Sequence, residues 1–433
     1  MSNADWVAIL GFAAMFLLMG LRVPLGVAMG LVGVFGFAAM RGLQPALNLL
    51  TTSPIRVITD FNLSLVPFFV LMGVFATNSG MSRELFRTGN AWLGQFRGGM
   101  ALATIAACSG FAAICGSSIA TAATMTRVAL PEMRRVDYDD ATSTGAIAAG
   151  GTLGILIPPS VIMVVYAFLT ETDVGQLFMA GIIPGIMATL MYMATVLIAH
   201  GRRLPPGRKF DFAEAIASLK DVWAVLLLFI AVIGVIYLGV ATATEAAAVG
   251  AFLTMVIGIV RGRLDRRQIM ASLVEALRTS VVLFSVLIGA MLFGYFLAIT
   301  QAPQKITAFM IALDLGAYGT LTLILIMFFI AGALMDEMAM IILMVPIVFP
   351  VVTHLGFDPI WFGIIIVTAC QLGMICPPVG INVFVINSIA KDVRLTTIYG
   401  GVMPFILTDI IRMVLLVVFP AIALWLPMTM HMR

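Results

Sequence analysis

The sequence predicts an all-α polytopic membrane protein, and three observations carry that prediction. Of 433 residues, 62% are hydrophobic and only 10% are charged, whereas a soluble protein has about a quarter of its residues charged. Apolar runs of 16 to 28 residues recur from Trp6 to Pro427, and most are long enough to cross the ~30 Å hydrocarbon core as helices. No alternating ten-residue pattern indicates a β-barrel. A water-soluble enzyme is therefore excluded.

Charge and cysteine content narrow the function further. The formal net charge is +3, without a run of five or six like charges, so nucleic acid is not an expected partner. The N-terminus has no basic residue before its first apolar run, unlike a cleavable signal peptide, so the first helix is expected to be retained. The four cysteines lie in apolar runs without metal-ligand spacing, which favours packing roles: Cys108, Cys115, Cys370 and Cys376.

An internal repeat at an offset of 219 residues indicates two homologous halves. The first half is expected over 1–199 and the second over 222–433, joined by a cytoplasmic linker at 200–221. The matched pairs are Gly20 with Gly239, Pro131 with Pro350, Leu153-Gly154 with Leu372-Gly373, Pro158-Pro159 with Pro377-Pro378, Asp173-Val174 with Asp392-Val393, and Gly181 with Gly400.

Each half is expected to contain five crossings and one re-entrant helical hairpin, about ten transmembrane helices in all. An odd number of crossings gives the halves opposite orientations, which makes an inverted repeat. The first half has elements near 5–20, 24–40, 64–80, a hairpin at 98–131, a broken helix at 141–169, and 178–199. The second has elements near 222–239, 243–260, 280–299, a hairpin at 319–353, a broken helix at 360–389, and 401–427.

The distribution of basic residues supports this topology, because cytoplasmic loops carry an excess of Lys and Arg. One side collects 18 of the 24 basic residues, including Arg202 and Arg203 in the linker, whereas the other holds Arg41, Arg56, Lys305 and Arg433. Both termini are therefore expected to face the periplasm. Three amphipathic segments, 46–60, 82–96 and 264–279, are expected to lie along the membrane surface in contact with lipid.

The first hairpin and the helix after it contain residues that interrupt helices. The hairpin run of 34 residues is barely long enough for two spans, and its centre reads CGSS at 115–118. The following helix contains GGTLGILIPPS at 150–160, where paired prolines remove two backbone donors. Carbonyls freed within the membrane suit a small cation, and the N-termini of half-helices attract an anion. A cation-coupled anion carrier requires both.

The second half repeats this arrangement with different side chains. Its hairpin centre reads GALMDE at 332–337, and its broken helix reads QLGMICPPVGIN at 371–382. An acidic residue at hairpin depth is costly unless it is functional or paired, so Asp336 is a candidate site residue. The structural alternative for Asp336 and Glu337 is capping of a helix at the hairpin turn.

These segments resemble a known family over nearly the whole chain. The sequence is similar to the large membrane subunit (DctM) of tripartite ATP-independent periplasmic (TRAP) transporters. The matching motifs are GSSIATA at 116–122, LPEM at 130–133, GTLG at 151–154 with PPS at 158–160, GIIPG at 181–185, TATEAAAVGA at 242–251 and PPVGIN at 377–382.

The resemblance implies a sodium-driven importer in a bacterial inner membrane. A periplasmic substrate-binding protein would deliver an organic anion, usually a carboxylate, and a small four-helix membrane subunit would complete the assembly. The hairpins and broken helices would form a transport domain that moves past a scaffold as an elevator. The alternative is a sodium-coupled anion symporter that needs no binding protein. The chain has no Gly-x-x-x-x-Gly-Lys-Ser/Thr loop that would indicate ATP as the energy source.

The resemblance also implies about two sodium sites and one substrate site. The first sodium site would involve Ser117, Ser118, Gly151 and Thr152, and the second Gly332, Asp336, Gln371, Gly373 and Pro377. The substrate would contact Ser118, Pro159 and Asn382. Arg127 departs from the family, which often has small residues at that point of the hairpin, and it could pair with an anionic substrate.

Several of these residues have a structural alternative. Asn382 could instead cap freed backbone, and Arg127 could extend to the cytoplasmic surface. Outside the motifs, Asp409 and Arg412 are three residues apart on a predicted helix and are expected to pair. Glu245, with Thr244 as the N-cap, is expected to stabilise the start of the helix at 243–260.

Overall fold

The computed structural model describes residues 3–201 and 204–430, and these residues form helices and loops without a β-strand. Six of the described helices are long and apolar enough to cross a membrane, or seven if the bent pair of α4 and α5 counts as one span. Shorter apolar helices of 10–17 residues, such as α1 and α2, accompany them. The prediction of an all-α polytopic membrane protein is confirmed. The predicted basic positions Arg202, Arg203 and Arg433 lie outside the described residues.

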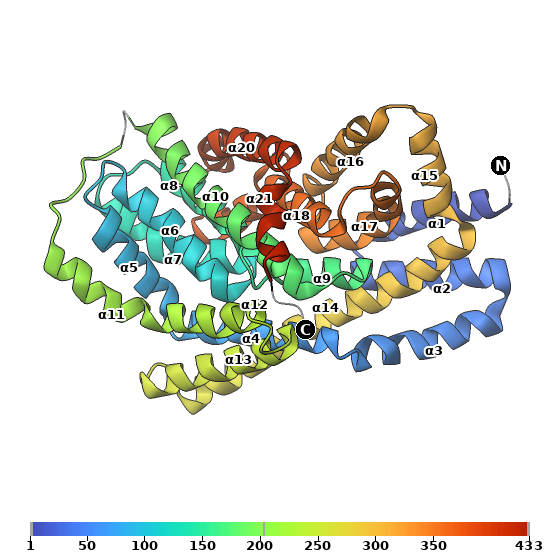
Figure 1. Ribbon diagram of the computed structural model, residues 1–433, viewed down its shortest axis with the longest axis horizontal. Coiled ribbons are helices and arrows are strands. Elements are labelled where there is room, and N and C mark those ends of the chain that lie inside the picture. Colours follow the sequence, from blue (N-terminus) through green and yellow to red (C-terminus); the bar gives the residue numbers. More distant parts are fainter. Residues whose placement is uncertain (1–2, 202–203, 431–433) are drawn as a thin grey trace.

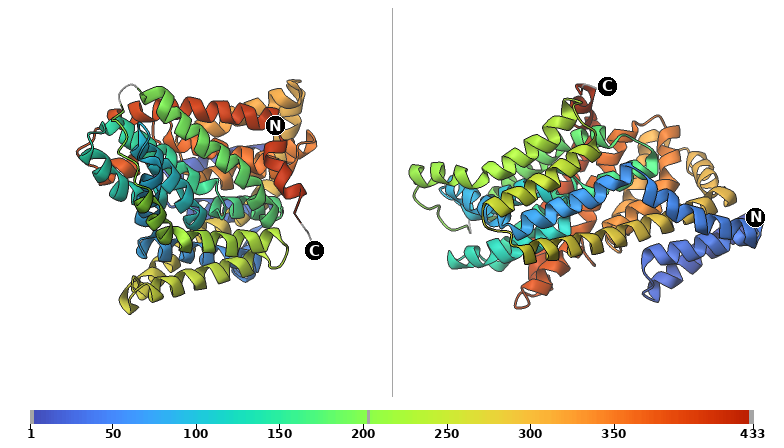
Figure 2. Two further views of the ribbon diagram at one scale, coloured as in Figure 1. Left: turned by 60° about the vertical axis from the view of Figure 1, so that its left-hand side comes forward. Right: turned by 90° about the horizontal axis from the view of Figure 1, so that it is seen from below.

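The first five helices of each half make up a group that contains one layer of long helices, with α3, α11, α13 and α14 along the bottom of Figure 1, whereas α5 and α15 also pack against α6 and α17. Within it, α14 packs along α2 and against α4, while α13 packs against α4 and α11 against α5. Seen from below, these long helices run roughly parallel (Figure 2, right). The helices are α1 (Asn3–Gly20), α2 (Leu25–Arg41), α3 (Leu43–Thr59), α4 (Leu65–Asn78), α5 (Met81–Leu93), α11 (Phe212–Phe229), α12 (Val235–Tyr237), α13 (Ala243–Val260), α14 (Arg266–Thr300) and α15 (Ala302–Ala312).

The later helices of both halves form a second group that holds the hairpins and the broken helices. Here α7 packs against α8 and α19, α8 against α20, and α18 against α16 and α20. The helices are α6 (Gly99–Cys115), α7 (Ser118–Arg135), α8 (Asp140–Thr152), α9 (Val161–Thr170), α10 (Val174–His200), α16 (Gly316–Gly332), α17 (Glu337–His354), α18 (Pro359–Ile375), α19 (Ile381–Ile389), α20 (Leu395–Val418) and α21 (Ala421–Met428).

Glycines allow α2 and α14 to approach each other closely. A Cβ atom added to Gly26 would lie 2.5 Å from the Ser285 carbonyl oxygen, and one added to Gly289 would lie 2.0 Å from the Gly26 carbonyl oxygen. Small residues at such contacts let helix backbones pack together in a membrane, where the lipid supplies no hydrophobic driving force between helices. This contact joins the first half of the chain to the second.

The predicted surface segment 264–279 is wrong as a separate element. It forms one continuous helix with the following span, α14, because Asp265 and Gln268 form a capping box at its start and no Gly or Pro occurs before Gly289. Its 35 residues extend about 52 Å, well beyond the ~30 Å hydrocarbon core.

Three further boundaries differ from prediction. The linker at 200–221 ends earlier than predicted, because the Asp211 carboxylate caps α11, which begins at Phe212. The helix predicted at 401–427 is two helices, α20 and α21, which are separated at Pro420, a residue without the N–H that a continuous helix needs. Helix α13 is capped by Thr242 rather than Thr244.

Candidate site at the hairpin tips and helix breaks

The first hairpin turns within two residues. Gly116 has a φ of +63° and ends α6, and Ser117 caps α7 because its Oγ accepts a hydrogen bond from the Ala120 N–H at 3.3 Å. The left-handed conformation at Gly116 is one that glycine adopts without strain. The tip is largely buried, with Ser118 fully inaccessible to solvent.

The first helix break lies directly against this tip. Helix α8 ends at Thr152, one 3-10 turn follows, and α9 begins only at Val161. A Cβ atom on Gly154 would lie 2.5 Å from the Ser117 carbonyl oxygen, and one on Gly116 would lie 2.6 Å from the Pro159 carbonyl oxygen. Main chain therefore meets main chain here, and the residues of the break are buried.

Asn382 connects the tip of the first hairpin to the second broken helix. Its Nδ2 donates to Ser118 Oγ at 2.8 Å and to the Ala148 carbonyl at 3.2 Å, and the Ser118 hydroxyl is 3.1 Å from Asn382 Oδ1. Ser118 is the first residue of α7 and Asn382 the second of α19, so the N-terminal ends of these two helices meet at this contact. Both side chains are fully buried.

The second hairpin and break have the same plan but are more exposed. Asp336 caps α17, with its Oδ1 accepting from the Ala339 N–H at 2.9 Å, and it lies 219 positions after Ser117. A Cβ atom on Gly373 would lie 2.6 Å from Gly332 Cα. Asp336 and Pro377 are exposed, unlike Ser118 and Pro159.

Two side chains satisfy carbonyls freed at the breaks. At the second break, the Tyr399 hydroxyl lies 2.9 Å from the Pro378 carbonyl oxygen and 2.7 Å from that of Val379. At the first, the Ser160 hydroxyl donates to the Ile155 carbonyl at 2.7 Å. These are backbone groups that a lipid environment leaves without other partners.

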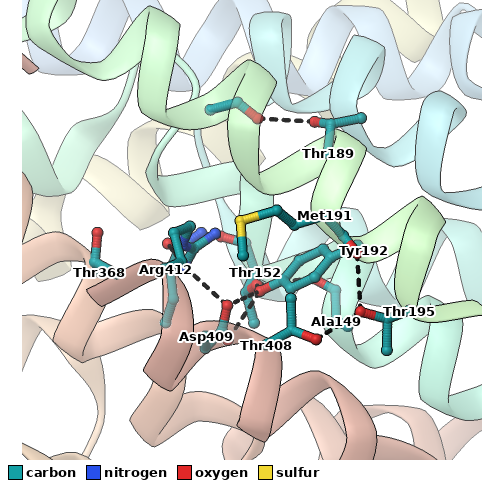
Figure 3. A network of polar contacts seen from close by, with 12 residues as sticks. Ala149, Thr152, Thr189, Met191, Tyr192, Thr195, Thr368, Thr408, Asp409 and Arg412 are labelled. Carbon is teal, nitrogen blue, oxygen red and sulfur yellow. Dashed lines mark hydrogen bonds and ion pairs between the residues drawn. The ribbon is translucent and has the colours of Figure 1, made fainter. Parts of the chain in front are cut away.

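Thr152 and Gln371 belong to a buried polar network that also includes Tyr192, Asp409 and Arg412. Figure 3 shows Thr152, Tyr192, Asp409 and Arg412. Gln371 Nε2 donates to the Thr152 carbonyl at 2.8 Å, and Arg412 Nη2 donates to Gln371 Oε1 at 2.7 Å. The predicted pairing of Asp409 with Arg412 is confirmed at 3.0 Å, with both side chains fully buried. The other residue, Tyr192, donates to Asp409 Oδ1 at 2.7 Å.

The structure thus places the predicted site residues in three locations. Ser117, Ser118, Gly151, Pro159 and Asn382 lie together at the first tip and break, where a Cβ on Gly151 would be 3.2 Å from Asn382 Nδ2. At the second hairpin and break, Gly332 meets Gly373, with Asp336 and Pro377 in the adjoining turns. The remaining two residues of the predicted sodium sites, Thr152 and Gln371, contact each other between the breaks.

Arg127 lies apart from these residues, about 13 Å along α7 from Ser118 by the helical rise. It is exposed and lines a surface cavity of 450 Å³ with Arg134, Arg135 and Asp392. Arg134 pairs with Asp392 at 2.7 Å, and the pKa of Asp392 is lowered by a hydrogen bond from its own backbone N–H and by Arg134. Arg127 therefore has the accessible position expected of an arginine that extends to the membrane surface.

The chemistry of these sites rests on main-chain carbonyls and short hydroxyls. The described residues contain no group of three or more His, Cys, Asp or Glu side chains that could hold a metal ion. Glu337 is buried beside Asp336, and its Oε2 has no hydrogen-bond partner among the described residues. Oxygen donors of this kind suit hard cations rather than soft ones.

The sequence reasoning missed Tyr192 and Tyr399. Tyr192 lies within the predicted segment 178–199 and Tyr399 lies two residues before the predicted segment 401–427, and a buried hydroxyl needs a hydrogen-bond partner. That rule could have identified them as members of polar networks, although it could not have named their partners.

Comparison with known proteins identifies the family. The model of the family described as "Tripartite ATP-independent periplasmic transporter, DctM component" matches residues 12–422. A C4-dicarboxylate TRAP transporter large permease protein from Pseudomonas aeruginosa is 37% identical over 399 residues, covering 89% of this chain and 93% of the relative. An isethionate TRAP transporter permease protein DctMQ from Oleidesulfovibrio alaskensis is 34% identical over 432 residues, covering 98% of this chain and 67% of the relative.

A solved structure shares the fold. The YdaH transporter of Alcanivorax borkumensis, whose crystal structure has an unusual topology, aligns with a TM-score of 0.65 over 87% of this chain and 89% of that one, at 14% identity. The polytopic helical fold and the family match agree, and the relatives are permeases rather than enzymes. This chain belongs to the DctM family, the large permease component of tripartite ATP-independent periplasmic transporters of the inner membrane.

Proposed function

We propose that this chain carries an organic anion, most simply a carboxylate, into the cell together with sodium ions. The relatives named above are assigned to a C4-dicarboxylate and to isethionate, and both of these substrates are anions. The single observation that carries the proposal is the contact of Ser118 with Asn382, because it brings two helix N-termini together inside the protein. Helix N-termini attract negative charge.

Sodium would bind on either side of this anion site. The first site would use the tip at Ser117 and Ser118 with the main chain near Gly151, and the second would use Gly332, Asp336, Gly373 and Pro377. The close main-chain approach at Gly154 and Gly373 supports this assignment, because it places the backbone of each hairpin against the backbone of its helix break. Sodium bound at both tips would order the anion site between them, so sodium would raise substrate affinity and substrate would raise sodium affinity.

Transport would proceed by an elevator movement. The group of helices α6–α10 and α16–α21 would carry the ions and the anion, and the layer of long helices would remain fixed in the membrane. The packing of the hairpins and broken helices against one another supports this proposal, and the contacts of α5 with α6 and of α15 with α17 would rearrange as the groups move. Both termini would face the periplasm, with the basic loops in the cytoplasm.

Two partners would complete the transporter: a small four-helix membrane subunit and a periplasmic substrate-binding protein. The Pseudomonas relative is named a large permease protein, and that name supports a smaller membrane partner. The binding protein would select the substrate and present it to the anion site.

Reconstitution into liposomes tests the proposal. Uptake of labelled C4-dicarboxylate and isethionate would be measured with the chain alone, with the small subunit, and with both subunits and the binding protein encoded near it. We expect uptake only in the complete system and only with a sodium gradient. Uptake that is unchanged when choline replaces sodium would refute the sodium coupling, and uptake by the chain alone would identify a symporter that needs no binding protein.

A further inference from the structure

The side chain of Arg412 is fully buried within the membrane-spanning part of the protein. Its Nη2 donates to Gln371 Oε1 at 2.7 Å and pairs with Asp409 Oδ1 at 3.0 Å, and the guanidinium carbon lies 5.6 Å from the centre of the Tyr192 ring. Its Nε and Nη1 have no hydrogen-bond partner among the described residues. Ionised side chains at such depth are costly and are usually tied to function.

One arm of this network leads from Arg412 to the first helix break. A guanidinium can only donate hydrogen bonds, so Gln371 must turn its oxygen toward Arg412 and its amide toward Thr152. That amide donates to the Thr152 carbonyl at 2.8 Å. Thr152 is the N-cap of the 3-10 turn at Leu153–Ile155, so its carbonyl also accepts the first hydrogen bond of that turn. Gln371 adds a side-chain donor to this carbonyl and links it to Arg412.

The other arm reaches the side chain of the same threonine. Asp409 accepts from the Tyr192 hydroxyl at 2.7 and 2.9 Å, and that hydroxyl lies 3.2 Å from Thr152 Oγ1 (Figure 3). Because the Tyr192 proton goes to Asp409, Tyr192 can only accept from Thr152 Oγ1, and the single proton of Thr152 is shared between Tyr192 and the Ala149 carbonyl, which lies 2.7 Å away. Thr152 is thus held at its carbonyl and at its hydroxyl by the two arms of one network, which draws on α8, α10, α18 and α20.

We infer that Arg412 is a positioning residue for the first sodium site: through Gln371 and Asp409 it holds Thr152, and with it the main chain between Gly151 and Gly154 that faces the hairpin tip. Gly154 is in close contact with Ser117, only two residues from Thr152. Rotation of the Thr152 peptide would therefore turn the adjoining carbonyls away from the tip. The inference rests on the proposed sodium coupling, because it assigns a role to Arg412 at a sodium site.

The experiment measures sodium binding without transport. The purified chain, together with its small subunit, is titrated with sodium chloride at constant ionic strength made up with choline chloride, and thermal unfolding is recorded at each concentration. Three variants are compared with the wild type: Arg412→Met, the double variant Asp409→Asn with Arg412→Met, and Tyr192→Phe. The matched control is Thr408→Val, which removes a contact between Thr195 and Thr408 that also joins α10 to α20 but does not reach Thr152.

The double variant separates positioning from a purely structural role. It removes the buried carboxylate together with its partner, so the folded state no longer contains an unpaired charge, yet Gln371 still lacks its anchor. We expect the sodium concentration at half-saturation to rise about tenfold in both Arg412 variants and about threefold in Tyr192→Phe, with no change in Thr408→Val. A double variant or a Tyr192→Phe variant that binds sodium as the wild type does would overturn the inference. Absence of a sodium effect in the wild type would instead refute the proposed sodium coupling.

Discussion

Gln371 donates a hydrogen bond of 2.8 Å to the carbonyl of Thr152, and the two residues are 219 positions apart, which is the offset of the internal repeat. Each residue lies in the last two turns before its helix break. The two halves of the chain therefore meet directly at equivalent positions, in the middle of the machinery proposed for transport. The side chain of Gln371 therefore links the main chain at the first break directly to the helix that precedes the second break.

The role of Asp336 as a cap can be separated from its role as a cation ligand. Asn caps helices as well as Asp does, so Asp336→Asn should keep the hydrogen bond from Ala339 and change stability by less than about 0.5 kcal/mol. The loss of charge should raise the sodium concentration for half-maximal uptake about tenfold, equivalent to about 1.4 kcal/mol. Unchanged sodium dependence would mean that this carboxylate is only a cap.

Its companion variant, Asp336→Ala, removes both roles. It should also lower the unfolding free energy by about 1 kcal/mol through loss of the N-cap. Thermal unfolding of the two variants in the absence of sodium measures that difference.

Gly373→Ala should disrupt the second hairpin. Its Cβ would lie 2.6 Å from Gly332 Cα, a main-chain atom that cannot rotate away, and overpacking of this kind costs about 1–3 kcal/mol. The matched control is Gly400→Ala, also within a helix, where a Cβ would have no neighbour within 4 Å. Thermal unfolding should show loss of stability in the first variant and none in the second, and equal stability would contradict the observed approach of α16 to α18.

Tyr399→Phe should weaken the second helix break. It removes the hydroxyl near the carbonyl oxygens of Pro378 and Val379, and loss of one such hydrogen bond costs about 1 kcal/mol. The control Tyr318→Phe alters an exposed tyrosine that packs on Phe357. Stability measured by thermal unfolding should fall in the first variant only. A Tyr399→Phe variant as stable as the control would show that these carbonyls need no protein donor.

The elevator movement predicts that the two tips change accessibility in opposite directions. Cys115, beside the first tip, is buried, whereas Leu334, at the second, is 61% exposed. In variants with a single cysteine at one of these positions, a membrane-impermeant maleimide should label residue 334 quickly and residue 115 slowly. Addition of sodium and substrate should shift the two rates in opposite directions, and rates that move together would argue against the elevator.

The sequence predicted the hairpin tips and helix breaks because their residues are incompatible with a continuous helix. Paired prolines at 158–159 and 377–378 remove donors wherever they occur, and Ser117 and Asp336 are strong N-cap residues in any fold. Such effects are local, so they can be inferred from a few neighbouring residues. Pro420 also lacks a backbone donor, so the break between α20 and α21 could have been predicted from the sequence in the same way.

The network around Arg412 could be predicted only in part. Asp409 and Arg412 pair within one helix turn, which their spacing indicated. Their contacts with Tyr192 and Gln371 join helices that are more than 200 and about 40 residues away in the chain, and those contacts depend on how whole helices pack. The continuity of α14 was missed for a different reason, because its amphipathic beginning resembles a surface helix although nothing interrupts it.

Binding of radioactive sodium to the purified chain with its small subunit, in the absence of substrate, tests the central claim most directly. The account predicts saturable binding that unlabelled sodium displaces and choline does not, at about two sites per chain, with one of them about tenfold weaker in Asp336→Asn. Absence of saturable binding, or sites of wild-type affinity in that variant, would contradict the assignment of the hairpin tips and helix breaks as sodium sites.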